Sequence, residues 1–98
     1  MTNATAKVSG SVIASADKYE TVEGNIYFPP DSINKSFFSP SDTHTSCPWK
    51  GIASYYDVTV DGNTLKDAAW YYPNPKEKAT NIKDHVAFYK TKVDVSTA

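Results

Sequence analysis

The chain has 98 residues, of which 40% are apolar and 13% aromatic, which is typical of one small globular domain over residues 1–98 and excludes a disordered segment. Its 10 basic and 11 acidic residues are scattered and leave a formal charge of −1, so we expect no nucleic-acid partner. Cys47 is the only cysteine, which excludes an intrachain disulfide and favours a reducing, cytoplasmic location. No apolar run approaches the roughly 20 residues of a membrane-spanning helix, so we expect no membrane partner.

Short strands are predicted before residue 30. Residues 7–14 and 19–23 should form two strands around a corner at Ala16–Asp17, and residues 25–28 should form a third. Pro29–Pro30 ends that strand, because proline has no backbone N–H to donate to a neighbouring strand. The N-terminal third of the chain therefore favours β structure.

The clearest alternation of apolar and polar residues runs over residues 51–60. One face of this strand should be buried in the core, and the other face should be more exposed to solvent. The first face carries Ile52, Ser54, Tyr56, Val58 and Val60, and the opposite face carries Ala53, Tyr55, Asp57 and Thr59. Asp61–Gly62 can adopt the positive backbone angles of a tight hairpin, so residues 64–72 should return antiparallel beside residues 51–60.

Helical structure is expected only as short turns. Asp31 could cap one turn through Asn34, since its carboxylate can accept from exposed amides, and residues 76–79 could form another. Residues 86–89 and 92–95 are predicted to be closing strands. The predicted fold class is therefore mainly β, a small antiparallel domain with one or two short helical turns.

Several sequence blocks, in this order, resemble a known family. The blocks are Val22-Glu23-Gly24-Asn25, Tyr27-Phe28-Pro29, Thr45-Ser46-Cys47-Pro48-Trp49-Lys50-Gly51, Ala53-Ser54-Tyr55-Tyr56, Ala69-Trp70-Tyr71-Tyr72, Pro75 and Ile82-Lys83-Asp84-His85-Val86-Ala87-Phe88-Tyr89. Together they cover nearly the whole chain and resemble the domain of unknown function 427 (DUF427) family. The resemblance implies a small β-tent, or Mss4-like, fold.

The resemblance also bears on cofactors. Some members of the family carry a nucleotidyltransferase-like label, but the glycine loop and the paired metal-binding aspartates of that chemistry are not visible here. Several β-tent relatives hold zinc with two cysteine pairs, a set that one cysteine and two histidines cannot reproduce. We therefore expect no metal and no cofactor.

Candidate site residues lie in the blocks that carry the resemblance. Glu23 and Lys50 could form a structural ion pair, or present an acceptor and a donor to a polar ligand. Lys50 could also lower the pKa of the Cys47 thiol, with His44 as a base, although a lone cysteine is more often a small buried hydrophobe. The predicted ligand-binding residues are Glu23, Tyr27, Cys47, Lys50, Tyr55, Trp70 and Tyr72.

Three functions remain open at this point. A binding module would hold a small polar or planar ligand in an aromatic-lined pocket, and we favour this reading because aromatic rings with one or two charges are the usual lining of such pockets. An enzyme would use Cys47 as nucleophile, or Glu23 and Lys50 as acid and base. An interaction domain would use a sheet edge or the aromatic surface to bind a partner chain or to form a homodimer.

Overall fold

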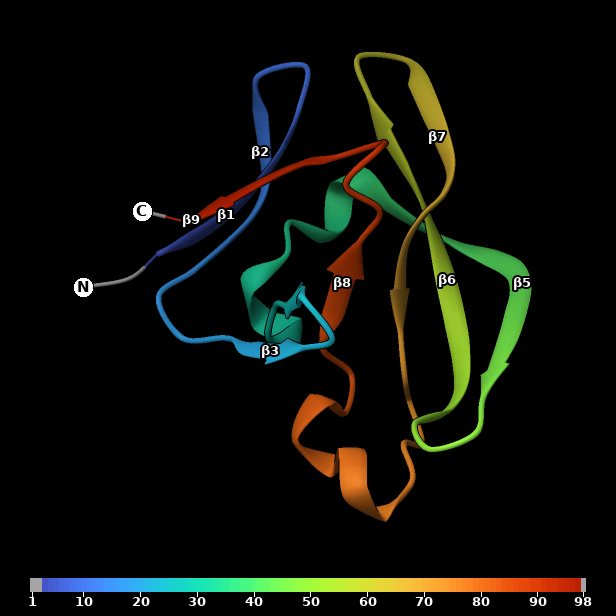
Figure 1. The fold of residues 1–98 in the computed structure, drawn as a ribbon. Helices are drawn as coiled ribbons and strands as arrows, with labels where there is room; N and C mark the ends of the chain where they lie inside the picture. The colour runs from blue at the N-terminus through green and yellow to red at the C-terminus, as the bar shows by residue number, and fades with distance from the viewer. Residues whose placement is uncertain (1–2, 98) are drawn as a thin grey trace.

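The computed structural model describes residues 3–97, which form a mainly-β domain (Figure 1). The strands are β1 (Ala4–Val8), β2 (Ser11–Ala16), β3 (Glu20–Val22), β4 (Asn25–Tyr27), β5 (Phe38–Cys47), β6 (Gly51–Val60), β7 (Asn63–Tyr71), β8 (Val86–Phe88) and β9 (Asp94–Thr97). They form three antiparallel sheets, in the orders β2-β1-β9, β3-β4 and β5-β6-β7-β8. The mainly-β antiparallel fold class is thus confirmed, and the finer β-tent arrangement stays a prediction.

The first sheet corrects the prediction of one strand over residues 7–14. The chain turns back at Ser9 and Gly10, whose φ angles of 50° and 81° suit a tight hairpin, so this stretch is divided between β1 and β2. The strands predicted at residues 19–23 and 25–28 are present, slightly shorter, as β3 and β4, which pair with each other and not with β2. The last strand, β9, begins two residues later than predicted and pairs with β1.

The central hairpin of β6 and β7 matches its prediction closely. Asp61 and Gly62 connect the two strands with φ angles of 52° and 79°, and the strands pair antiparallel from Ser54 opposite Tyr71 to Val60 opposite Asn63. Strand β8 then pairs with β7, and β5 pairs with the other side of β6. The four-stranded sheet occupies the right half of Figure 1.

Strand β5, ten residues long, had no counterpart in the sequence prediction. Its residues are mostly exposed or half-buried and include Pro40, and its register with β6 shifts between Pro40 and His44. An edge strand of this kind is held by backbone hydrogen bonds and so shows no apolar alternation. It nevertheless carries the chain into the turn that holds Lys50.

Two clusters of buried residues pack in the fold. The first contains residues of β1, β2, β6, β7 and β8, with Phe28 and Val93, and the second gathers Tyr27, Ala53, Tyr55, Tyr72, Ala79, Ile82 and Ala87. Consecutive residues of β8 alternate between the clusters: Val86 and Phe88 belong to the first, and Ala87 to the second. The sheet therefore has buried side chains on both of its faces.

This arrangement corrects the predicted faces of β6. The buried positions are Gly51, Ala53 and Tyr55 in the first half of the strand but Val58 and Val60 in the second half. Each half thus faces a different cluster. Ile52, which was expected in the core, is 62% exposed.

The short helical turns are three 3-10 segments, η1 (Pro30–Ser32), η2 (Lys35–Phe37) and η3 (Glu77–Ile82). The predicted cap at Asp31 is wrong: Asp31 lies inside η1, which follows Pro29 and has no side-chain cap. Asn34 instead caps η2, where its side-chain oxygen accepts from the Ser36 amide. The turn expected at residues 76–79 is longer and ends at Ile82.

Candidate functional site

Lys50 lies at the end of the tight turn between β5 and β6, next to Tyr72 of the second buried cluster. Its side chain is 10% exposed and donates to a carboxylate oxygen of Glu23, whose own side chain is 54% exposed. Glu23 occupies the turn between β3 and β4 with a φ of 53°. Two turns that are distant in the sequence therefore bring together a buried ammonium and an exposed carboxylate.

Both partners of this pair are kept charged at neutral pH. The hydrogen bond from Lys50 lowers the pKa of the Glu23 carboxyl below its usual value, with a smaller contribution from Trp49. Burial opposes the charge of Lys50, but the hydrogen bond to Glu23 and the neighbouring Tyr27 and Tyr72 hydroxyls outweigh it, so the pKa of Lys50 is raised. Lys50 is thus an ammonium and not a neutral amine.

Aromatic rings surround the ammonium. The Lys50 Nζ atom lies 5.3 Å from the centroid of the Trp49 ring and 5.7 Å from that of Tyr72, within the range of cation–π attraction. Tyr72 is nearly buried, whereas Trp49 is 39% exposed. Of these two rings, Tyr72 is therefore held in the core and Trp49 faces solvent.

Tyr27 and Trp70 form a second pair of rings in the cluster. Tyr27 is fully buried, and the Trp70 Nε1–H donates to its hydroxyl at 3.2 Å. Their ring centroids are 6.3 Å apart with an interplanar angle of 85°, which is the favourable edge-to-face arrangement. Burial raises the pKa of Tyr27, so its hydroxyl keeps its proton at neutral pH.

Tyr55 and Tyr89 extend the ring cluster. The Tyr55 hydroxyl lies 2.9 Å from Thr45 Oγ1 and 3.3 Å from the Tyr89 hydroxyl, and Tyr89 in turn lies 4.7 Å from Trp70 between ring centroids. The hydrogen bond with Tyr55, together with burial, raises the pKa of Tyr89 to about 12. The raised pKa keeps the Tyr89 hydroxyl protonated at neutral pH, so it supplies no base there.

The predicted ligand-binding residues lie in one region of the molecule. Tyr27, Tyr55 and Tyr72 are buried members of the second cluster, Cys47 and Trp70 pack against it, and Lys50 and Glu23 form the ion pair beside it. A hollow beside His44 and another beside Asp17 are lined by other residues.

The structure separates His44 from Cys47. The two residues are three positions apart on a regularly paired stretch of β5, so their side chains point to opposite faces of the sheet. His44 lies opposite Ser54, while Cys47 packs against the second cluster. The pairing of His44 as a base with Cys47 is therefore wrong.

The set of predicted ligand-binding residues omits three residues of this region: Thr45, Trp49 and Tyr89. Trp49 and Tyr89 stood inside the family blocks, and a tryptophan directly before the lysine of a tight turn was the available signal for the first. Nothing in the sequence indicated that Thr45 bonds to Tyr55, because the strand that carries Thr45 was not predicted.

Within residues 3–97, no three His, Cys, Asp or Glu side chains lie close enough to hold a metal ion. In the same range, no helix is both long and apolar enough to cross a membrane.

Comparison with known proteins gives one match and one negative result. A family model described as "Domain of unknown function (DUF427)" matches residues 2–98, which is almost the whole chain. Among curated proteins, none matches this chain.

Proposed function

The chain belongs to the domain of unknown function 427 family, and from the site that the family's blocks build we propose that it is a binding module for a small planar ligand with an anionic group. The ligand's anionic group would bind the Lys50 ammonium, and its ring would lie against Trp49. We place this binding in the cytosol, because a single cysteine suits a reducing compartment.

The observation that carries the proposal is the position of Lys50. An ammonium group has three N–H donors, and among residues 3–97 only Glu23 forms a side-chain hydrogen bond with Lys50. Glu23 is exposed and sits on a turn, so it can turn away into water when a ligand arrives. A buried cation with spare donors beside an exposed indole suits an anion attached to a ring.

The same chemistry favours binding over catalysis at this position. A lysine acts as a nucleophile or a base when its pKa is depressed, and the pKa of Lys50 is raised. The tyrosine hydroxyls around it have raised pKa values and hold their protons. A charged lysine beside protonated tyrosine hydroxyls offers fixed hydrogen-bond donors, which supports a binding role.

The proposal is tested by thermal shift with a panel of nucleoside monophosphates and aromatic carboxylates. A ligand at about 100 times its dissociation constant adds roughly 2.7 kcal/mol of stability, which raises the unfolding temperature of a domain this size by roughly 10 °C or more. Trp49, as an exposed indole, should also change its fluorescence. We expect Lys50→Met, which retains the apolar stem and removes the charge, to abolish both responses.

The matched control is Lys66→Met. Lys66 also pairs with an aspartate, Asp57, but its side chain is 70% exposed and it lies outside the second cluster. The control should bind as wild type does. A ligand that binds Lys50→Met as tightly as wild type would contradict the proposed site.

A further inference from the structure

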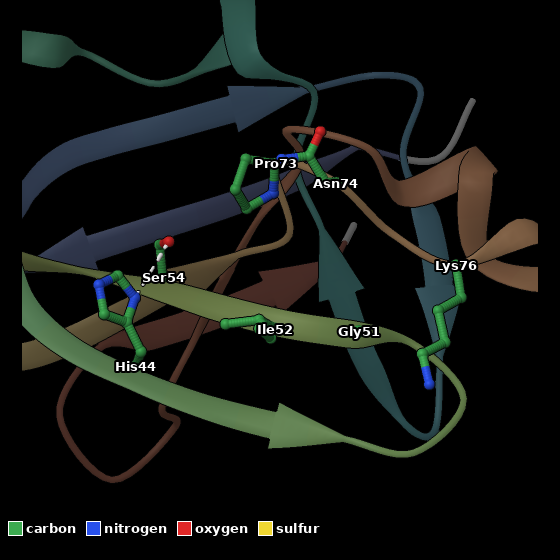
Figure 2. A pocket seen from close by; sticks show the side chains of 7 residues that line it. All are labelled: His44, Gly51, Ile52, Ser54, Pro73, Asn74 and Lys76. Atoms are coloured by element: carbon green, nitrogen blue, oxygen red, sulfur yellow. Dashed lines mark hydrogen bonds between the residues drawn. The ribbon is translucent and has the colours of Figure 1, made fainter.

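A hollow of about 440 Å³ lies beside Ile52 and Ser54 (Figure 2), on the face of β6 opposite to Tyr55. Its lining comes from β5 and β6 and from the segment between β7 and η3, and consists of His44, Gly51, Ile52, Ser54, Pro73, Asn74 and Lys76. Ile52 and Ser54 alternate along β6 with Ala53 and Tyr55, which point into the second cluster. The hollow is therefore a separate site from the one at Lys50, and its volume is within the range of small-ligand pockets.

The wall of the hollow is held in place by the backbone. The Lys76 amide donates to the Lys50 carbonyl at 2.9 Å, and Lys76 Nζ donates to the Pro48 carbonyl at 2.7 Å. Gly51 lets the segment approach this closely, since a Cβ atom there would lie 3.2 Å from the Asn74 carbonyl oxygen. Pro73 and Pro75 restrict the segment further. The hollow is thus formed before any ligand arrives.

The floor of the hollow is aliphatic. Ile52 is 62% exposed, the largest exposed fraction among the bulky apolar side chains that the structure describes. Pro73 faces it from the other wall, and the only ring with π electrons in the lining is the His44 imidazole. An aliphatic chain that covered Ile52 would remove this apolar surface from water.

The polar groups of the hollow favour an anion. The lining holds two basic residues, His44 and Lys76, and no carboxylate. His44 and Ser54 are cross-strand partners at one end of the hollow, and their mutual hydrogen bond is long at 3.4 Å, which leaves the Ser54 hydroxyl able to donate to a ligand. A carboxylate fits at this end, with an aliphatic tail over Ile52.

We propose that this hollow is a second binding site, which takes a short aliphatic carboxylate. The carboxylate accepts hydrogen bonds from Ser54 and His44, and the tail packs between Ile52 and Pro73. The proposal does not depend on the function assigned to Lys50, because the two sites lie on opposite faces of β6 and differ in the chemistry of their linings.

The experiment titrates wild type with hexanoate, hexanamide and hexylammonium, three probes with the same tail and with charges of −1, 0 and +1. The chain has five isoleucines, so labelling their methyl groups gives a simple NMR spectrum with internal controls. We expect hexanoate to shift the Ile52 signal with a dissociation constant on the order of 1 mM, typical of a fragment of this size. The Ile82 signal, from the second cluster, should not move.

Variants separate the two parts of the site. Ile52→Thr keeps a β-branched residue and should weaken hexanoate binding about tenfold, as expected for the loss of one apolar group from a hydrophobic contact. Because this variant lacks the Ile52 methyl signal, its binding, and that of wild type for comparison, is followed through the backbone amide signal of Ser54. Ser54→Ala should weaken hexanoate binding by about tenfold or more and bring its affinity close to that of hexanamide, because it removes a donor to a charged acceptor. Val12→Thr changes another exposed β-branched residue outside the hollow and should leave binding unchanged.

Three results would overturn the proposal. The first is that hexylammonium shifts the Ile52 signal as strongly as hexanoate does, which would remove the argument from charge. The second is an Ile52 signal that does not move with hexanoate, and the third is hexanoate binding that stays intact in both Ile52→Thr and Ser54→Ala. Binding lost in Lys50→Met but retained in those two variants would assign hexanoate to the Lys50 site instead.

Discussion

Lys50 is held charged by a carboxylate that itself lies in water. Taking an ammonium out of water is costly, and replacing a buried ion pair by apolar residues of similar size is often neutral or stabilising. The aromatic surroundings of Lys50 would accept a methionine readily, so stability alone gives no reason for a lysine there. The proposed role in binding an anion supplies a reason for a lysine at this position.

The contribution of the Glu23–Lys50 pair to stability should depend on pH. The folded-state pKa of Glu23 lies below its unfolded value of about 4.3, so the contribution is complete above that value and is lost as the pH falls through the lowered folded pKa. We expect Glu23→Gln to unfold at a lower temperature than wild type at neutral pH, and the difference to close in acid. Thermal melts followed by circular dichroism at a series of pH values measure this.

Glu77→Gln is the control for this series. Glu77 lies at the exposed start of η3, outside the two ion pairs found within residues 3–97, and its substitution should change the melting temperature little at any pH. A difference between Glu23→Gln and wild type that stayed constant down to the lowest pH would show that the Glu23 charge does not contribute.

At the scale of elements, the turn that holds Lys50 and the segment at residues 73–76 support one another. Gly51 has a φ of 113°, and the backbone of Asn74, Pro75 and Lys76 packs directly on it. No L side chain adopts this φ without strain, and an added Cβ would fit only if the Asn74 backbone shifted by a few tenths of an ångström. A single glycine therefore positions Lys50 and also forms one end of the hollow.

We expect Gly51→Ala to reduce the free energy of unfolding by about 1–3 kcal/mol, from backbone strain and the close approach to Asn74. Gly62→Ala is the matched control, because Gly62 also has a positive φ, of 79°, but nothing lies within 4 Å of an added Cβ. Urea denaturation should show the smaller loss for Gly62→Ala. Equal losses in both variants would mean that the packing of residues 73–76 adds nothing.

The sequence was sufficient to predict elements whose signal is local. The β6–β7 hairpin follows from alternation on both sides of Asp61–Gly62, and it appears almost residue for residue. Strand β5 could not be predicted, since its exposed residues are held by backbone bonds to β6 that leave no pattern in the side chains. The turn at Ser9–Gly10 did carry a signal, which was overlooked in favour of one longer strand.

The candidate site was predicted through its family blocks and not through its geometry. The resemblance picked out Glu23 and Lys50, and the structure pairs them. It could not predict that Lys50 is the buried partner, because that burial depends on Tyr27, at the end of β4, and on Tyr72, which follows β7. The hollow at Ile52 was missed for a related reason: alternation along β6 predicts one buried face, whereas the fold buries a different face at each end.

Over the whole molecule, the two buried clusters are joined through β8 and β4. Phe28 and Val86 exchange backbone hydrogen bonds of 2.8 Å in both directions. Phe28 belongs to the first cluster and its neighbour Tyr27 to the second. Side chains of the short strand β8 likewise pack into both clusters, so loss of either cluster removes support from that strand.

We therefore expect the domain to unfold in a single cooperative transition. Ile13→Val in the first cluster and Ile82→Val in the second should each cost about 0.5–1.5 kcal/mol, which lowers the unfolding temperature by several degrees.

Tryptophan fluorescence reports on the second cluster, because Trp70 packs against it and Trp49 lies beside Lys50. Ile13→Val should lower the fluorescence midpoint as much as the midpoint from circular dichroism. A fluorescence midpoint unmoved by Ile13→Val would show that the clusters unfold independently.

Strand β1 lies between β2 and β9, with Ala4 opposite both Ala16 and Thr97. During synthesis, β1 can form its hairpin with β2 early. The other edge of β1 stays unpaired until residues 94–97, which form β9, have left the ribosome. Contacts over so large a sequence separation slow folding, and until they form an unpaired strand edge is open to other chains. The order in which the ribosome delivers the strands thus leaves the nascent chain vulnerable to aggregation until β9 emerges and pairs with β1.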